Sequence, residues 1–138
     1  MTERDWQDLV DDMRRTDANI AAAAAARLHK HASLEDLPRL RELLGDDDPF
    51  LREAAAWPIS EIAGPALLRE LLTAYQRGLN EGQDNDGFTA ALVDLATVNP
   101  LGCRGVLQQL ADSETGTIQE NAIWLLEFCE QGGSVRSS

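Results

Sequence analysis

Aromatic residues and cysteine are scarce in this sequence. Aromatic side chains make up 5% of the 138 residues, and the cysteines are Cys103 and Cys129. With so few large rings, alanine and leucine must supply most of the apolar packing, and both are strong helix formers. Two cysteines are fewer than small secreted domains use for a disulfide framework, so we interpret both as free thiols in a reducing compartment.

Long apolar runs and positive charge are also lacking. The run from Ala21 to Ala26 follows an acidic segment and precedes Arg27, unlike the core of a secretory signal peptide. No run approaches the roughly 18 apolar residues that span a bilayer, so we expect a cytoplasmic protein with no membrane segment. The net charge is −12, from 24 acidic and 12 basic side chains. Such a surface repels nucleic acid and favours a basic protein as partner.

No spacing of residues indicates a catalytic or metal site. His29 and His31 are two positions apart, so on a helix they point in different directions, unlike the i, i+4 pairs that share a metal. The segment 84–87 resembles part of a calcium loop, but Gly82 and Val93 stand where its first aspartate and its last glutamate belong. We therefore expect no enzyme activity, no cofactor and no metal.

Helical periodicity and turn residues divide the chain into eight helical segments. Four are expected near residues 3–15, 34–44, 88–98 and 117–130; the others contain the alanine run or begin at Asp48, Gly64 and Asn99. Short turns between them predict an all-α domain over residues 1–131 with no sheet. It would consist of four antiparallel hairpins, at about 3–31, 33–63, 64–98 and 99–131, followed by a flexible tail at 132–138.

The segment DPFLREAAAWPISEIAG carries a family resemblance. It opens with Asp-Pro, continues with an apolar residue, Arg52 and paired alanines, and ends with isoleucines. This pattern resembles the second helix of a HEAT repeat of the short bacterial kind. Pro58 departs from it, because a proline inside a helix removes one hydrogen bond and usually bends the axis. The resemblance implies that the hairpins stack into a right-handed α-solenoid, with the second helix of each pair lining the concave side.

The second helices of the four hairpins share a frame. Their first apolar residues are Ile20, Leu51, Phe88 and Ile118. At 100° per residue, a stripe opposite these residues contains Glu53, Trp57, Asp94, Glu120, Trp124 and Glu127. Tryptophan beside acids is a combination that binding hot spots use, so we predict that this stripe contacts a partner. Alternatively, each tryptophan packs on a neighbouring helix. In the first hairpin, Ala22 and Ala26 fall on this stripe.

A second candidate surface is an acidic edge. Turns within the hairpins are rich in acids, most clearly at Asp46, Asp47 and Asp48, whereas the turns between hairpins have none. If the hairpins stack in parallel, the acidic turns lie along one edge and could face a partner. Alternatively, an aspartate in each turn caps the following helix and complements its dipole.

These features predict a non-catalytic protein-binding module, monomeric or weakly dimeric. The more specific hypothesis is an acidic immunity protein that blocks a basic, nuclease-like toxin, with carboxylates occupying the toxin's phosphate-binding surface. The alternative is an accessory subunit of a bilin lyase or of another modifying enzyme, since some HEAT-like proteins resemble bilin lyase subunits.

Overall fold

The computed structural model describes the backbone of residues 2–137 and the side chains of residues 2–130. Over this range the chain is all-helical and contains no strand, which confirms the all-α part of the prediction. The helices are α1 (Glu3–Met13), α2 (Ala18–His31), α3 (Leu37–Leu44), α4 (Pro49–Ala63), α5 (Leu68–Asn80), α6 (Asp86–Val98), α7 (Pro100–Ser113) and α8 (Gly116–Ser137), with short 3-10 helices at Leu34–Asp36 and Gly64–Leu67. None of the helices in the described range is long and apolar enough to cross a membrane.

Local capping explains several helix starts. The carboxylate of Asp17 accepts hydrogen bonds from backbone N–H groups at the start of α2, and Asp48 accepts one at the start of α4. The side chain of Asn99 does the same for α7, with Pro100 in the first turn. These side chains satisfy N–H groups that have no partner within the helix. The predicted boundaries at these positions therefore follow from residues within three positions of each start.

Some boundaries differ from those predicted. The segments expected as single helices from residue 34 and from residue 64 each begin with a 3-10 turn. Helix α6 begins at Asp86, two residues earlier than expected. The backbone of α8 continues to Ser137, past the predicted end near residue 130. The side chains of residues 131–138 lie outside the described residues, so a flexible tail at 132–138 stays a prediction.

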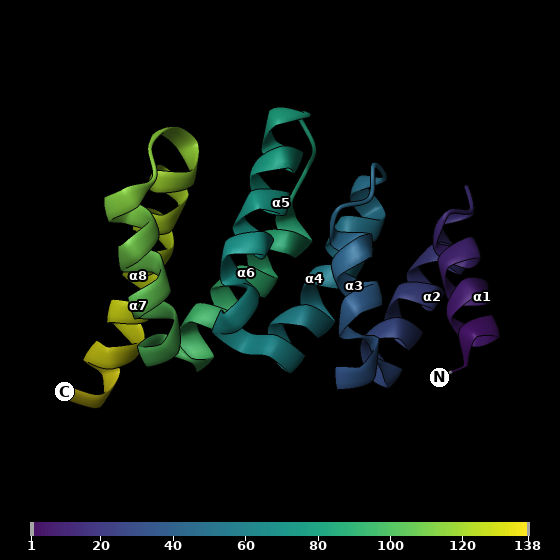
Figure 1. Cartoon of the computed structure of the whole chain (residues 1–138), viewed down its shortest axis with the longest axis horizontal. Coiled ribbons are helices and arrows are strands. Elements are labelled where there is room, and N and C mark those ends of the chain that lie inside the picture. The colour runs from purple at the N-terminus through teal and green to yellow at the C-terminus, as the bar shows by residue number, and fades with distance from the viewer. Residues whose placement is uncertain (1, 138) are drawn as a thin grey trace.

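The helices are arranged in two layers. Figure 1 shows successive helix pairs following one another along the long axis, with the two termini at opposite ends. The even-numbered helices contact each other in order, α2 to α4, α4 to α6 and α6 to α8, and form one layer. Helices α3, α5 and α7 contact each other in the same way and form the other. Between α5 and α6 direct contact is sparse, and α6 instead packs mainly on α4 and α8.

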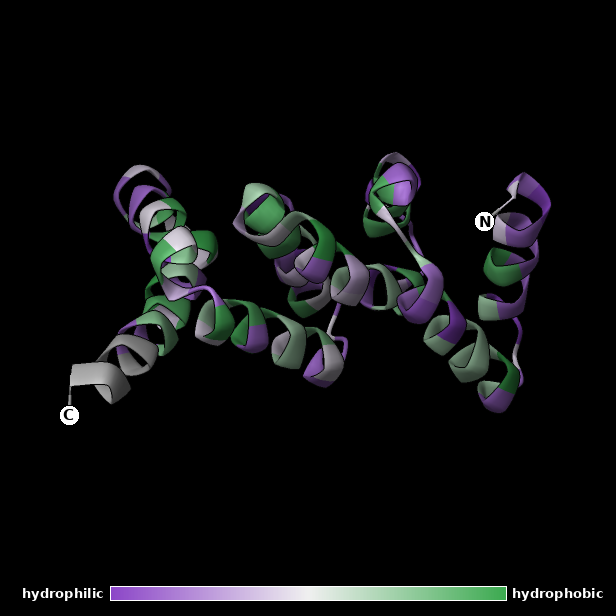
Figure 2. Ribbon diagram, turned by 90° about the horizontal axis from the view of Figure 1, so that it is seen from below, coloured by the Kyte–Doolittle hydropathy of each residue, from purple (hydrophilic) through white to green (hydrophobic). Residues whose placement is uncertain are grey.

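The core between the layers is made mostly of leucine and alanine. Hydrophobic residues occur in every helix, while hydrophilic residues gather at several turns (Figure 2). Ala24, Ala55 and Ala122 occupy equivalent positions in the second-helix frame, and all three are fully buried. Alanine at these positions lets neighbouring helices approach closely. Ala22 and Ala26, by contrast, are exposed, so only part of the alanine run is explained by packing.

Candidate protein-binding surfaces

The acidic turn between α3 and α4 is held by an arginine from the end of α1. One oxygen of Asp46 accepts a hydrogen bond from Nη2 of Arg14 at 2.6 Å, and the other accepts one from the Asp48 N–H at 2.8 Å. The hydrogen bond from Arg14 lowers the pKa of Asp46 below its usual value. Asp48 in turn caps α4 by accepting the Phe50 N–H at 2.9 Å. Two of the three acids are therefore used in shaping their own turn and joining it to α1.

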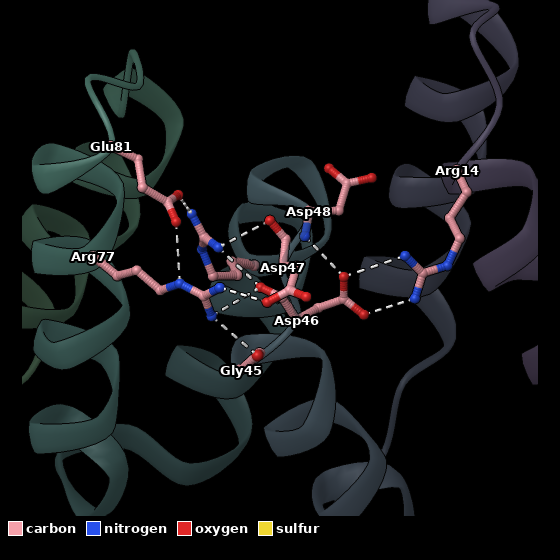
Figure 3. Close-up of polar contacts among 8 residues, drawn as sticks. Arg14, Gly45, Asp46, Asp47, Asp48, Arg77 and Glu81 are labelled. Atoms are coloured by element: carbon pink, nitrogen blue, oxygen red, sulfur yellow. Dashed lines mark hydrogen bonds and ion pairs between the residues drawn. The ribbon is translucent and has the colours of Figure 1, made fainter.

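Two further arginines, Arg52 of α4 and Arg77 of α5, reach the same turn. Figure 3 shows Arg77 among the acids of this turn. The Arg52 side chain is only 2% exposed and forms an ion pair with Glu81. Its Nη1 donates to the carbonyl oxygens of Asp46 and Asp47, at 2.9 and 3.3 Å. Arg77 pairs with Asp47 at 2.6 Å and with Glu81 at 3.2 Å. The hydrogen bond from Arg52, and then that from Arg77, lowers the pKa of Glu81.

We call this set of contacts the turn network: Arg14, Asp46, Asp47, Arg52, Arg77 and Glu81. It joins the end of α1, the α3–α4 turn and the α5–α6 turn, which belong to three successive helix pairs. The sequence analysis identified the acids of this turn as a candidate surface, but it did not predict that Arg14, Arg52 and Arg77 pair with acids or carbonyl groups there. Asp47 is the acid whose side chain remains fully exposed, at 100%, while still paired with Arg77. Binding of a partner by Asp46, Asp47 or Asp48 stays a prediction, beside the structural role that these contacts define.

Glu53 belongs to α4, and its carboxylate lies against the start of α6 rather than on an open stripe. Its carboxylate is half-buried and accepts a hydrogen bond from the Gly87 N–H. A Cβ atom at position 87 would collide with this carboxylate, so glycine lets the carboxylate approach the backbone at the start of α6. Burial raises the pKa of Glu53, and the neighbouring charges of Asp84 and Asp86 raise it further. Glu53 therefore acts as a cap supplied by another helix, which no local sequence signal indicates.

Each of the two predicted stripe tryptophans packs against a neighbouring helix and stays partly exposed. The Trp57 ring on α4 lies 5.9 Å from the His29 ring on α2. Trp124 on α8 stacks on Tyr75 of α5, with ring centroids 6.2 Å apart and planes 9° apart, and meets Phe128 edge-on. Helix α6 separates α4 from α8, so the structure does not bring the two rings together.

The remaining predicted residues are free carboxylates on α6 and α8. Asp94, Glu120 and Glu127 are all exposed. Within residues 2–130, none of the three takes part in a hydrogen bond or an ion pair. They lack the arginine partners that engage the acids of the turn network, so their charge is directed to solvent.

From α3 onward, charge is divided between the two layers. The first helix pair differs, because α2, in the same layer as α4, carries Arg27 and Lys30 and no acid. Along α4, α6 and the described part of α8, the one basic residue is the buried Arg52. The acidic residues of these helices are Glu53, Glu61, Asp86, Asp94, Glu120, Glu127 and Glu130. Helices α3, α5 and α7 instead carry five arginines, at positions 39, 41, 69, 77 and 104, against three acids. We call the first set the acidic layer and the second the arginine layer.

The thiols offer little reactivity. Cys103 and Cys129 are both buried, on the adjacent helices α7 and α8. Burial, and to a smaller extent the nearby Cys129, raises the pKa of the Cys103 thiol to about 12. A thiol with such a pKa is protonated at neutral pH and is a poor nucleophile. Among residues 2–130, moreover, no three His, Cys, Asp or Glu side chains are placed to hold a metal ion.

Comparison with family profiles, with curated protein sequences and with solved structures finds no match for this chain. The HEAT resemblance of α4 therefore rests on the residues of this sequence alone.

Proposed function

We propose that this chain is a non-catalytic protein-binding module, built as a short right-handed α-solenoid of four HEAT-like hairpins. Its side-chain links support a repeat of about 30 residues. The pairs Arg14–Asp46, Asp47–Arg77 and Arg52–Glu81 join positions 32, 30 and 29 residues apart. Links of such similar length are expected where each hairpin contacts the next through equivalent turns.

The observation that carries the binding proposal is the set of unpaired carboxylates on the acidic layer. Asp94, Glu120 and Glu127 are exposed and unpaired on helices that carry no exposed basic residue in the described range. A surface of one sign attracts a surface of the other and steers its approach. The partner is therefore a protein with a basic surface, and a nuclease-like toxin blocked by this chain is our specific hypothesis.

Charge reversal on each layer tests this proposal. The variant D94K/E120K/E127K reverses the acidic layer, and E35K/E42K/D112K is its matched control. Each set makes three reversals of exposed residues, so the change in net charge is the same. Glu53 is left unchanged because it caps α6 and its reversal would disturb the fold.

Wild-type protein immobilised on resin captures partners from a native lysate, and mass spectrometry identifies them. The affinity of each purified partner is then measured for both variants by calorimetry. We expect D94K/E120K/E127K to weaken binding at least about tenfold, because each reversal replaces an attraction with a repulsion. The control should remain close to wild type. A toxin partner should also lose its nuclease activity when wild-type protein is added. Equal losses in both variants, or a partner without a basic surface, would contradict the proposal.

A further inference from the structure

A groove lies between α3 and α5, in the arginine layer. It has a volume of about 320 Å³, and its lining includes Arg41, Arg69 and Arg77. The buried side chains of Leu44 and Ala74 supply an apolar part of the lining. In a protein of net charge −12, three arginines around one groove are an unusual concentration of positive charge.

Two of these arginines are held in place by acids outside the groove. Arg77 is fixed by Asp47 and Glu81 in the turn network. Arg69 forms an ion pair with Glu114, in the turn between α7 and α8. These ion pairs hold the side chains of Arg69 and Arg77 in place and compensate their positive charges.

The groove also contains groups that lack partners. Arg41 is exposed, and within residues 2–130 it makes no hydrogen bond or ion pair. The Oε2 atom of Glu70 is buried and accepts no hydrogen bond from any described residue. A buried acceptor without a donor is costly, and it is usually satisfied by a protein group or an ordered water. The groove thus offers an unpaired cation, Arg41, beside an apolar surface.

We propose that this groove binds an acidic peptide segment of another protein, with Arg41 contacting a side-chain carboxylate. A guanidinium binds a carboxylate through two parallel hydrogen bonds. An apolar side chain of the segment would lie against Leu44 and Ala74. A carboxylate suits the groove better than a phosphate, because the larger negative charge of a phosphate is repelled more strongly by Glu70. This site is independent of the acidic layer proposed above to bind a basic protein.

The test uses three capped peptides with the full chain. The first contains two adjacent glutamates flanked by leucines; the second has glutamines and the third phosphoserines in place of the glutamates. NMR titration at low salt follows the backbone amides and the arginine Nε–H signals. We expect the glutamate peptide to shift signals of α3 and α5, and the glutamine peptide to bind at least about tenfold more weakly.

Variants separate the site from general charge effects. Arg41→Ala should weaken binding of the glutamate peptide about tenfold or more. Arg41→Lys should weaken it by less, because lysine keeps the positive charge but lacks the paired N–H donors of the guanidinium. Arg104→Ala is the matched control, since it removes an exposed arginine of α7 and should leave binding within about twofold. Unchanged melting temperatures would show that these exposed substitutions leave the fold intact.

Four results would overturn the proposal: equal binding of the glutamate and glutamine peptides, no effect of Arg41→Ala, shifts confined to the acidic layer, or tighter binding of the phosphoserine peptide. The last result would identify a phosphopeptide site instead. D94K/E120K/E127K should bind the glutamate peptide at least as well as wild type. Failure of the groove proposal is therefore distinguishable from failure of the acidic-layer proposal.

Discussion

Replacing Arg52 with alanine should destabilise the protein by about 3 kcal/mol, as follows from the contacts of its side chain. The guanidinium donates to two backbone carbonyl groups, and each hydrogen bond from a charged donor contributes about 1.5 kcal/mol. Burial of the aliphatic stem adds about 1–2 kcal/mol. Removing a charge from the interior recovers part of its desolvation cost, which offsets part of this sum. The remaining loss is a large share of the roughly 5–15 kcal/mol that stabilises a typical domain.

Urea unfolding followed by far-UV circular dichroism measures this loss. The midpoint should fall while the slope stays close to that of wild type, since the surface exposed on unfolding changes little. Arg41→Ala is the control: it removes an exposed arginine with no described partner and should change stability by less than about 0.5 kcal/mol.

The ion pair with Glu81 adds a second check. Because Arg52→Ala and Glu81→Ala break the same pair, their effects should not add, and the double variant should be little less stable than R52A alone. If R52A unfolds within about 1 kcal/mol of wild type, the turn network contributes far less to stability than its burial and hydrogen bonds indicate.

Two further predictions concern single substitutions: one at Glu53 of α4, and one that compares Gly78 of α5 with Gly105 of α7. Burial raises the pKa of Glu53 in the folded state, so folding disfavours its charged form and wild-type stability falls as the pH rises through that pKa. Glu53→Gln keeps an oxygen for the Gly87 N–H; in urea unfolding from pH 4 to 8 it should exceed wild type at pH 7, with the difference shrinking toward pH 4, and a constant difference would contradict this. A Cβ atom at Gly78 would lie 2.6 Å from Oδ1 of Asn85, whereas one at Gly105 meets nothing within 4 Å. Gly78→Ala should therefore lower the melting temperature, while Gly105→Ala, in the middle of α7, should raise stability by up to about 1 kcal/mol; the reverse order would refute the packing argument.

Helix positions were largely predictable because their signals are local. Asp17, Asp48 and Asn99 each cap a helix through N–H groups two or three positions away, so the sequence around them contains all the necessary information. The buried alanines at 24, 55 and 122 likewise followed from a helical period of 3.6 residues.

The partners of the charged residues were not predictable in the same way. The sequence marked Asp46 as one of three acids in a turn, but its partner Arg14 is 32 residues away. Glu53 matched the partner-facing stripe by its helical angle, yet the neighbouring helix places Gly87 against it. Such pairings depend on the offset between helix pairs, which helical period within one segment does not define. Asp94, Glu120 and Glu127 are exposed and unpaired because, among the described residues, no neighbouring helix places a cation beside them.

The turn network also makes the helix pairs non-interchangeable. Apart from Arg77–Glu81, each link takes its cation from one helix pair and its anion from another. Arg14 precedes Asp46 in the sequence, whereas Arg77 follows Asp47. Deleting the pair α3–α4 would leave Arg14 and Arg77 without their aspartates, and deleting α5–α6 would leave the buried guanidinium of Arg52 with no counterion. Duplicating a pair would create the same mismatch at the new junction. The charges in the turns thereby specify the order of the helix pairs, and a shortened or lengthened array would need compensating changes in the neighbouring turns.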